Sequence, residues 1–481
     1  MIERINMTML TDFYELTMAN GYLEKGMQDQ IAYFDMFFRK IPDGGGFAIT
    51  AGLEQLIRCL QTLKFEEEDI VYLRKRGIFC EEFLEYLRNF KFECDVWAIP
   101  EGTPVFPSEP LVTVRGPVIQ SQFIETILLL LINHQSLIAT KANRIVRAAE
   151  GRGVMEFGTR RAHGASSAIY GARAAYIGGC IGTACAIADR EFGIPALGTM
   201  AHSWVQMFDS EYESFKAYAE IYPENCTLLV DTYNTLKSGV PNAIRVFKEQ
   251  KPQKMAIRID SGDVTYLTKK SRKMLDEAGL TACSIVVSNS FDEYLIRNVI
   301  DQGAEIDVFG VGERLITARS EPVFGGVYKM AALEKNGEII PKIKISENVE
   351  KITNPGFKTA YRFFDKDSGK ALADVITLAD EVISTEVDYE IFDPQFIWKR
   401  KTITNFNVKK LQERIFDKGE LVYKMPSINE IKQYCKEQID TLWEEVLRFE
   451  NPHEYFVDLS EELWTMKIKL IDERKDRNLV K

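Results

Sequence analysis

Between about residue 150 and residue 335, the chain repeats one pattern: a short apolar run, a polar or glycine-rich turn, and a stretch typical of a helix. The runs recur at intervals of roughly 20 to 40 residues, the spacing of successive strand–helix units. Because the apolar residues are continuous and do not alternate with polar ones, we expect strands buried on both faces, as in a parallel sheet. The segments are "GVMEFGTRR", "IPALGTMAHS", "CTLLVDTYNT", "KMAIRIDSGD", "CSIVVSNSFD", "IDVFGVGERL" and "GGVYKMAAL".

Seven such units predict an α/β protein with an irregular (β/α) barrel over residues 126–340, and a doubly wound open sheet is the alternative. The flanks, residues 1–125 and 341–481, carry mixed strand and helix patterns. We expect them to pack together as one discontinuous α+β domain. Residues 121–149 are predicted to form one long helix that leads into the barrel.

The charge balance excludes several classes of partner. The chain has 60 basic and 71 acidic residues and a formal net charge of −11, which argues against bulk binding to nucleic acid or to an anionic membrane. The longest apolar run, Ile127–Ile132, is far shorter than a membrane span. The first residues lack the apolar core of a signal peptide, and the eight cysteines form no CxxC pair, so we expect a cytoplasmic protein with reduced thiols.

In a (β/α) barrel, chemistry takes place at the carboxyl ends of the strands, in the loops that lead to the helices. Polar residues and glycines follow the apolar runs at those positions, so we expect them to line one mouth of the barrel. They are Arg160, Arg161, His202, Asp231, Arg258, Asp260, Ser288, Asn289, Gly310 and Gly312.

The segment "RIDSGD", residues 258–263, has two interpretations. Arg258 offers a cation for a phosphate, and Asp260 and Asp263 offer carboxylates for sugar hydroxyls or Mg²⁺. Alternatively, Ser261 or Asp263 caps the following helix by accepting backbone N–H bonds. The polar residues at the neighbouring strand ends favour the functional interpretation.

Two further segments suit anions and flat rings. In "VFGVGERL", Gly310 and Gly312 let the backbone approach an anion at a helix N-terminus, although two glycines also suit a plain turn. In "EFGTRRAHG", Phe157 is suited to stacking on a ring, and Arg160 or Arg161 to pairing with a carboxylate or phosphate. The alternative is that Phe157 is a core residue and one arginine belongs to a surface ion pair.

His202 is one of four histidines and lies in the segment "GTMAHSWVQ". Of the four, only His163 and His202 follow predicted barrel strands. The chain contains no GxxxxGK[ST] segment, which excludes a P-loop, and no HExxH or zinc-spaced Cys/His set. A packed imidazole, a metal ligand and a reactive group remain the alternatives for His202, and its small and polar neighbours favour chemistry.

Together these segments resemble the nicotinate phosphoribosyltransferase family of the type II phosphoribosyltransferases. The resemblance runs from "LTDFYELTMANGY", residues 10–22, through "EFGTRRAHG", "GTMAHSW", "DTYNTLKSG", "RIDSGD" and "VFGVGERL" to "GGVYKMAAL", residues 325–333. It implies that nicotinate and phosphoribosyl pyrophosphate give nicotinate mononucleotide and pyrophosphate in the salvage of NAD. ATP would be hydrolysed as a co-substrate, and Mg²⁺ would be bound with phosphoribosyl pyrophosphate and ATP.

The resemblance also implies roles for individual residues. His202 matches the histidine that ATP phosphorylates. Phe157 and Tyr14 match the two rings that hold the substrate ring between them, and Tyr14 would come from the partner subunit of a homodimer. The other matches are Arg160 and Arg258 for phosphoribosyl and carboxylate groups, Asp231 and Asp260 for the ribose and the reacting centre, Gly310 and Gly312 for the 5′-phosphate, and Arg39 and Lys329 for pyrophosphate. Arg161 and Ser288 are further substrate-binding candidates.

One departure from related enzymes bears on the substrate. Nicotinamide phosphoribosyltransferases resemble this family and carry an acid directly after a Gly-Thr pair, expected on the helix before the histidine. Here the corresponding residues are Gly182, Thr183 and Ala184. Without that acid there is no acceptor for an amide, which favours nicotinate.

Two other functions are alternatives for this chain. An aldolase or phosphosugar isomerase on the same barrel requires a Schiff-base lysine at a strand end, for which Lys329 is the candidate. A non-catalytic binding protein would be expected to lack the arginines and aspartates of the mouth, yet these are present.

Overall fold

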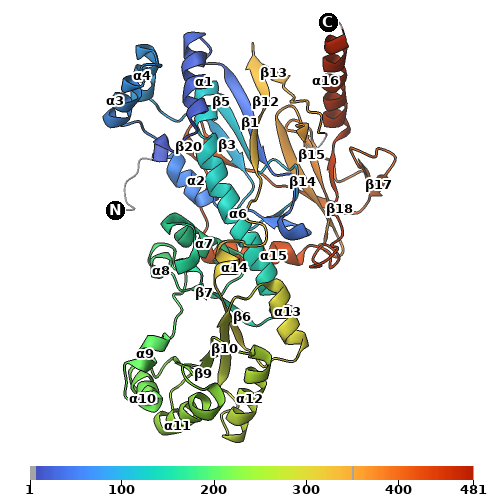
Figure 1. The fold of residues 1–481 in the computed structure, drawn as a ribbon. Helices are drawn as coiled ribbons and strands as arrows, with labels where there is room; N and C mark the ends of the chain where they lie inside the picture. The colour runs from blue at the N-terminus through green and yellow to red at the C-terminus, as the bar shows by residue number, and fades with distance from the viewer. Residues whose placement is uncertain (1–6, 349–350, 480–481) are drawn as a thin grey trace. The chain divides into compact units, whose positions relative to one another are not determined.

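The computed structural model describes residues 7–348 and 351–479, and the chain divides into two compact units. One unit is Ile138–Pro322, and the other combines Met1–Leu137 with Val323–Lys481 (Figure 1). The predicted α/β class is confirmed, together with a domain built from both flanks of the chain. The predicted boundaries at 125/126 and 340/341 stay predictions.

A six-stranded parallel sheet, a half-barrel, is the centre of the unit Ile138–Pro322. Its strand order is β7-β6-β11-β10-β9-β8, so that the first strand along the chain lies between the second and the last. This is the circular order of a barrel that is open on one side. The strands are β6 Gly153–Glu156, β7 Gly182–Thr183, β8 Cys226–Leu229, β9 Met255–Ile259, β10 Ser284–Asn289 and β11 Val308–Val311.

Two of the seven expected strands are not strands of this sheet. In "IPALGTMAHS", only Ala196 pairs, in a single bridge with Thr183. "GGVYKMAAL" forms β12 (Val327–Lys335), which pairs antiparallel with β1 (Ile31–Phe37) in the other unit. A short apolar run suits a parallel or an antiparallel sheet, so its pairing could not be inferred from the run alone.

Helices follow the parallel strands and several begin at a side-chain cap. Asp263 accepts the backbone N–H of Tyr266 over 3.0 Å, and Asp292 accepts that of Leu295 over 2.9 Å. The N-cap interpretation of Asp263 is therefore confirmed. The helices are α7 Ala165–Ile177, α8 Ala186–Phe192, α9 His202–Gln206, α10 Glu211–Ile221, α11 Val240–Gln250, α12 Val264–Glu277, α13 Glu293–Asp301 and α14 Glu313–Ile316.

The other unit contains an antiparallel seven-stranded sheet of order β13-β12-β1-β5-β3-β19-β20. Both flanks of the chain contribute strands to it. They are β3 Asp95–Ala98, β5 Val112–Pro117, β13 Glu338–Pro341, β19 Glu413–Asp417 and β20 Glu420–Leu421, with β1 and β12. The accompanying helices are α1 Phe13–Glu24, α2 Leu53–Leu60, α3 Glu67–Lys75, α4 Glu81–Arg88, α15 Ile428–Asp440 and α16 Glu461–Leu479.

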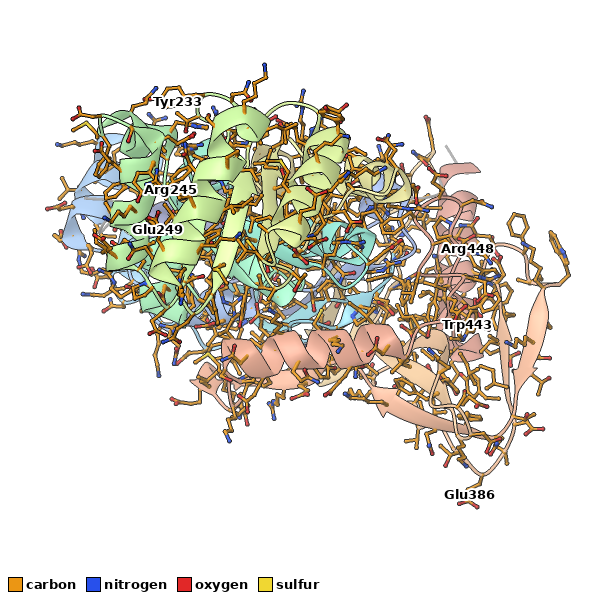
Figure 2. The ribbon with its side chains drawn as sticks, turned by 90° about the horizontal axis from the view of Figure 1, so that it is seen from below. Tyr233, Arg245, Glu249, Glu386, Trp443 and Arg448 are labelled. Carbon is orange, nitrogen blue, oxygen red and sulfur yellow. The ribbon has the colours of Figure 1, made fainter. Side chains whose placement is uncertain are left out.

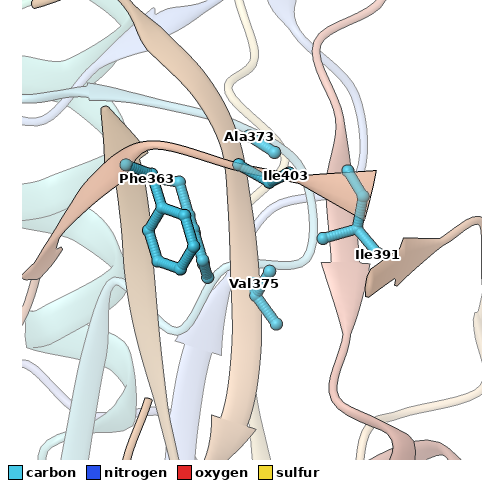
Figure 3. Close-up of a cluster of buried hydrophobic side chains, with 6 residues drawn as sticks. Phe363, Ala373, Val375, Ile391 and Ile403 are labelled. Atoms are coloured by element: carbon cyan, nitrogen blue, oxygen red, sulfur yellow. The ribbon is translucent and has the colours of Figure 1, made fainter. Parts of the chain in front are cut away.

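A second sheet of order β18-β14-β15-β21 lies in the same unit beside the hairpin β16–β17. Side chains of this sheet and of the hairpin together form a buried cluster of Phe363, Ala373, Val375, Ile391, Ile403 and Phe406 (Figure 3). The strands are β14 Lys358–Asp365, β15 Ala371–Leu378, β16 Tyr389–Phe392, β17 Arg400–Ile403, β18 Phe406–Lys410 and β21 Val457–Leu459.

A fully buried charged group lies in this second sheet. Arg362 Nε and Nη2 donate to the two carboxylate oxygens of Asp374 over 2.8 and 2.6 Å. The Tyr455 hydroxyl also donates to Asp374, over 3.0 Å. Glu109 is buried next to this pair, and burial together with the negative charge of Asp374 raises its pKa well above the ordinary value.

The predicted long helix is present as α5 (Val118–Phe123) followed by α6 (Glu125–Ala148). By length and composition alone this helical stretch, Val118–Ala148, would be able to cross a membrane, and 72% of its most apolar window is buried inside the structure. A helix that is buried to this extent is typical of the core of a folded protein.

Candidate active site

The carboxyl ends of the parallel strands carry the polar residues that the sequence predicts for the mouth. Phe157 directly follows β6, and Asp260 directly follows β9. Asp231 lies two residues beyond β8, whereas Ser288 and Gly310 occupy paired positions in β10 and β11. The parallel register therefore brings these five residues to one end of the sheet.

Asp260 is the centre of a polar cluster at this end. Its backbone N–H donates to Asp231 Oδ2 over 2.9 Å, and its carboxylate accepts a short hydrogen bond from Ser288 Oγ. Arg258 Nη2 lies 3.7 Å from Asp260 Oδ1, and His202 Nε2 lies 3.9 Å from Asp260 Oδ2. The structure thus brings all four predicted catalytic residues together, with Ser288.

Arg258 is held by the loop that precedes His202. Its Nη1 donates to Thr199 Oγ1 over 2.5 Å and to the carbonyl oxygen of Met200 over 3.1 Å. Burial lowers the pKa of Arg258, and the carboxylates of Asp260 and Asp231 oppose this shift. Its buried Nε has no hydrogen-bond partner among the residues that the structure describes. A cation with an unused buried donor is suited to an anionic ligand.

Asp231 uses one oxygen to fix the turn after β9. Asp231 Oδ2 accepts the backbone N–H of Asp260, and it also accepts the hydroxyl of Ser261 over 2.7 Å. Within residues 7–348 and 351–479, its buried Oδ1 has no hydrogen-bond partner. This oxygen is therefore available to accept a hydroxyl or to contact a cation.

His202 is the first residue of α9, and 38% of its side chain is exposed. Its Nδ1 lies 3.1 Å from Thr232 Oγ1. Tyr233, which directly follows Thr232 in the chain, is 62% exposed and lies at the surface in Figure 2. His202 is thus not a packed core imidazole, and in the part of the chain that the structure describes no three His, Cys, Asp or Glu side chains are arranged to hold a metal ion.

The Phe157 ring packs directly against Gly310. A Cβ added to Gly310 would lie 2.7 Å from Phe157 Cδ2 and 3.2 Å from Ser288 Cβ. A Cβ on Gly312 would lie 3.3 Å from the Phe157 carbonyl oxygen. Gly310 therefore has a packing role that sequence reasoning did not foresee: its missing side chain leaves room for the edge of the Phe157 ring.

Arg160 and Arg161 lie on the short helix Thr159–Arg161 that follows Phe157, and both are exposed. The charge of Arg160 lowers the pKa of Arg258, which places the two guanidinium groups within electrostatic reach of each other. Asn289 is exposed, and its side chain accepts the backbone N–H of Ser290, so it shapes the turn after β10.

Tyr14, Arg39 and Lys329 belong to the other unit. Tyr14, on α1, is 44% exposed, and its partial burial and the charge of Glu125 raise its pKa. Lys329 Nζ lies 3.5 Å from Glu125 Oε1, so Tyr14 and Lys329 share one carboxylate. The Arg39 guanidinium lies 5.5 Å from the centre of the Phe37 ring. Because Lys329 lies on the antiparallel strand β12 and not at a parallel strand end, the Schiff-base alternative loses its lysine.

Sequence reasoning missed three polar residues that support the mouth: Glu156, Thr183 and Thr232. The Glu156 carboxylate is fully buried and accepts hydrogen bonds from the backbone of Gly158 and the hydroxyl of Thr183. The sequence signal that could have indicated Glu156 is a single acidic residue at the end of an apolar run. Thr183 lies in the two-residue strand β7, not on a helix as expected, since so short a strand leaves no periodic pattern.

Comparisons with known proteins cover nearly the whole chain. Residues 9–133 match the nicotinate phosphoribosyltransferase (NAPRTase) N-terminal domain, residues 153–374 the nicotinate phosphoribosyltransferase (NAPRTase) family, and residues 357–467 the nicotinate phosphoribosyltransferase C-terminal domain. The chain is 45% identical over 474 residues to the nicotinate phosphoribosyltransferase of Bacillus subtilis, covering 98% of this chain and 96% of that protein. It is 31% identical to the Homo sapiens nicotinate phosphoribosyltransferase, over 95% of each chain.

A solved structure agrees with these sequence matches. The crystal structure of human nicotinic acid phosphoribosyltransferase superimposes with a TM-score of 0.84 at 28% identity, covering 96% of this chain and 99% of that one.

Proposed function

The chain belongs to the nicotinate phosphoribosyltransferase family, and from this premise we propose how the residues of its half-barrel mouth carry out the transfer. The pyridine nitrogen of nicotinate attacks C1 of phosphoribosyl pyrophosphate. The bond from C1 to the pyrophosphate oxygen breaks, and pyrophosphate leaves with the electron pair. The observation that carries the assignment of residues is the cluster of Asp260, Asp231, Arg258, Ser288 and His202 at one end of the sheet.

The two aspartates are proposed to stabilise the positive charge that develops on the ribose. Displacement at C1 passes through a state that resembles an oxocarbenium ion, and fixed carboxylates lower its energy without reorganisation. Asp260 is held by Ser288 and by its own backbone bond to Asp231. The unpartnered Oδ1 of Asp231 is suited to a ribose hydroxyl.

The phosphates are assigned to the basic groups and to the backbone after β11. Arg258, with its unused Nε donor, is proposed to bind an anionic group, together with Arg160. Gly310 and Gly312 are proposed to let the backbone approach the 5′-phosphate. Arg161 is a further substrate-binding candidate, and Arg39 and Lys329 are proposed to bind pyrophosphate.

Mg²⁺ is proposed to bind through the substrate phosphates, with few protein ligands. Hard cations prefer oxygen, and Mg²⁺ commonly takes one or two carboxylates together with phosphate oxygens. Asp231 and Asp260 are the carboxylates in place, and the buried unpartnered Oδ1 of Asp231 fits such a role. When bound, the ion neutralises charge on the leaving pyrophosphate.

The nicotinate ring is proposed to stack on Phe157, whose ring edge packs against Gly310. Tyr14 of a second subunit is proposed to cover the opposite face, which requires a homodimer. Ala184 directly follows β7, and its backbone N–H donates to the carbonyl oxygen of Glu156 over 2.8 Å, so it lies beside the turn of Phe157. A methyl group in place of an acid at this point favours the carboxylate of nicotinate over the amide of nicotinamide.

His202 is proposed to accept a phosphoryl group from ATP. If Nδ1–H donates to Thr232, the lone pair of Nε2 is free to attack the γ-phosphorus, and ADP leaves. Water later takes the phosphoryl group, which couples ATP hydrolysis to the transfer. We further propose a cytoplasmic location, because phosphoribosyl pyrophosphate and ATP are then both at hand.

One assay tests the proposal. The protein is incubated with phosphoribosyl pyrophosphate and Mg²⁺, with nicotinate or nicotinamide, and with or without ATP, and mononucleotide is measured by chromatography. We expect nicotinate mononucleotide, formed faster when ATP is present. Preferential turnover of nicotinamide would contradict the role of Ala184, and a rate independent of ATP would contradict the coupling.

A further inference from the structure

The carboxylate of Glu156 joins two turns at the mouth of the half-barrel. Glu156 is the last residue of β6, and its exposed fraction is 0%. It contacts one donor from the turn after β6 and one from the end of β7. The mechanism proposed above does not use this group.

On the β6 side, the carboxylate fixes the turn that carries Phe157. Oε1 accepts a short hydrogen bond from the backbone N–H of Gly158. A Cβ on Gly158 would lie 2.5 Å from Ile316 Cβ and 2.8 Å from Glu156 Oε1, so the backbone passes through a space that only glycine fits. The N–H of Phe157 donates to the carbonyl oxygen of Val311 over 2.7 Å. The Phe157 turn is thus fixed by two bonds to groups that are themselves buried.

On the β7 side, the same carboxylate fixes the turn that carries Ala184. Thr183 Oγ1 donates to Glu156 Oε2 over 2.6 Å and accepts the N–H of Cys185 over 3.0 Å. The N–H of Ala184 donates to the backbone carbonyl oxygen of Glu156 over 2.8 Å. The side chain and the backbone of one residue therefore hold the second turn.

The donors suit an ionised group. Burial raises the pKa of Glu156 above its ordinary value, and the bonds from Thr183 and Gly158 offset only part of this shift. Both carboxylate oxygens accept a hydrogen bond, which the neutral acid could do less well because one oxygen would carry a proton.

We propose that Glu156 is a positioning residue that locks the Phe157 turn to the Ala184 turn and so sets the shape of the nicotinate subsite. The inference rests on the proposed roles of Phe157 and Ala184 as walls of that subsite. A carboxylate that holds both turns lets neither move without the other, so its loss is expected to misplace the ring wall. The 5′-phosphate backbone after β11 keeps its own strand pairing and is expected to change little.

The test compares two matched pairs of variants in steady-state kinetics. Glu156→Ala removes both acceptors, whereas Glu156→Gln keeps an oxygen for Gly158. Thr183→Val removes the hydroxyl, whereas Thr183→Ser keeps it. We expect Glu156→Ala and Thr183→Val to raise the KM for nicotinate about tenfold or more, since small misplacements of a bound ring are costly. The KM for phosphoribosyl pyrophosphate should stay within about twofold, and Glu156→Gln and Thr183→Ser should recover most of the loss.

Leu275→Ala separates positioning from stability. Leu275 is fully buried in α12 and outside the cluster, so this variant should lower the urea midpoint without changing the KM for nicotinate. If Leu275→Ala raises that KM as much as Glu156→Ala does, the role of Glu156 is structural only and the proposal is overturned. Should Glu156→Ala fail to fold, the comparison of Thr183→Val with Thr183→Ser tests the proposal instead. Equal KM values for nicotinate in these two variants would overturn the proposal.

Phe157→Ala distinguishes this inference from the proposed function. If Phe157→Ala leaves the KM for nicotinate unchanged, the stacking role itself is wrong. If Phe157→Ala raises that KM and Glu156→Ala does not, stacking stands and the positioning role of Glu156 is wrong.

Discussion

At the scale of single residues, the mouth depends on a glycine that carries no functional group. The edge of the Phe157 ring occupies the place of a Gly310 side chain. The sequence predicted Gly310 as part of a phosphate loop, and its contact with Phe157 is a second reason for glycine at this position. Packing of this kind has no signature in a single sequence, because the two residues are 153 positions apart along the chain.

Gly310→Ala is expected to raise the KM for nicotinate roughly tenfold by pushing the Phe157 ring into the subsite. The measurement is the KM for nicotinate at saturating phosphoribosyl pyrophosphate. Gly198→Ala is the control, since a Cβ there meets nothing within 4 Å. An equal effect of both substitutions would contradict this explanation.

His202→Ala is expected to keep the fold and to bind nicotinate, but to form no phosphoenzyme with γ-labelled ATP. The reason is the loss of the partly exposed Nε2 at the mouth. His163→Ala, which alters an exposed histidine beyond β6, is the control and should be labelled normally. Acid-labile label on the His202→Ala protein would contradict the assignment.

At the scale of elements, the sequence predicted the strands that are continuous apolar runs with polar ends. Arg258, Asp260 and Ser288 lie close together because parallel pairing aligns the ends of β9 and β10. Apolar runs that end in polar residues are sufficient to predict this arrangement. The two-residue strand β7 and the antiparallel pairing of β12 escaped prediction. Both depend on which partner strand is available, and that is a property of the folded chain.

The buried acid next to the second sheet predicts a pH dependence of stability. Burial and the negative charge of Asp374 raise the pKa of Glu109 well above its ordinary value, although the nearby Arg362 opposes the shift. A raised folded pKa means that folding takes up a proton, so stability is full below about pH 4.5 and falls as the pH rises toward the folded pKa.

Glu109→Gln removes this proton uptake, and its amide can still accept the Phe106 N–H that Glu109 Oε2 accepts over 2.8 Å. Relative to the unaltered protein, the variant should gain up to about 1.4 kcal/mol per pH unit above about pH 4.5, until the folded pKa is reached. Urea unfolding at pH 5 and pH 8 measures this. The same stability difference at both pH values would show that Glu109 is ionised in the fold.

At the scale of the whole molecule, residues proposed to bind substrate are found in each of the two units of the chain. Phe157, Asp260 and His202 belong to Ile138–Pro322, whereas Tyr14, Arg39 and Lys329 belong to the unit built from the flanks. The motif around Tyr14 was found in the sequence, but a single chain gives no information about which subunit supplies it.

Mixing two inactive variants tests whether Tyr14 acts across a dimer. In a hybrid of Tyr14→Ala and Asp260→Ala chains, one of the two sites has every residue intact if Tyr14 comes from the partner. Random exchange of equal amounts should then restore about a quarter of the unaltered activity, because half of the dimers are hybrids with one intact site each. Each variant alone, taken through the same unfolding and refolding, is the control. Activity that stays at the level of the single variants would show that Tyr14 does not complete a partner's site.

The pairing of β1 with β12 also has a consequence for synthesis of the chain. β1 (Ile31–Phe37) gains its β5 neighbour early, but its other edge pairs with residues 327–333, roughly 300 residues later. At about 5–20 residues per second, the ribosome supplies β12 some 15–60 seconds after β1. Throughout that interval one edge of β1 is open and able to pair with another chain. Nascent chains shorter than about 335 residues are therefore the species that most need a chaperone, and a slower ribosome should lower the yield of soluble protein.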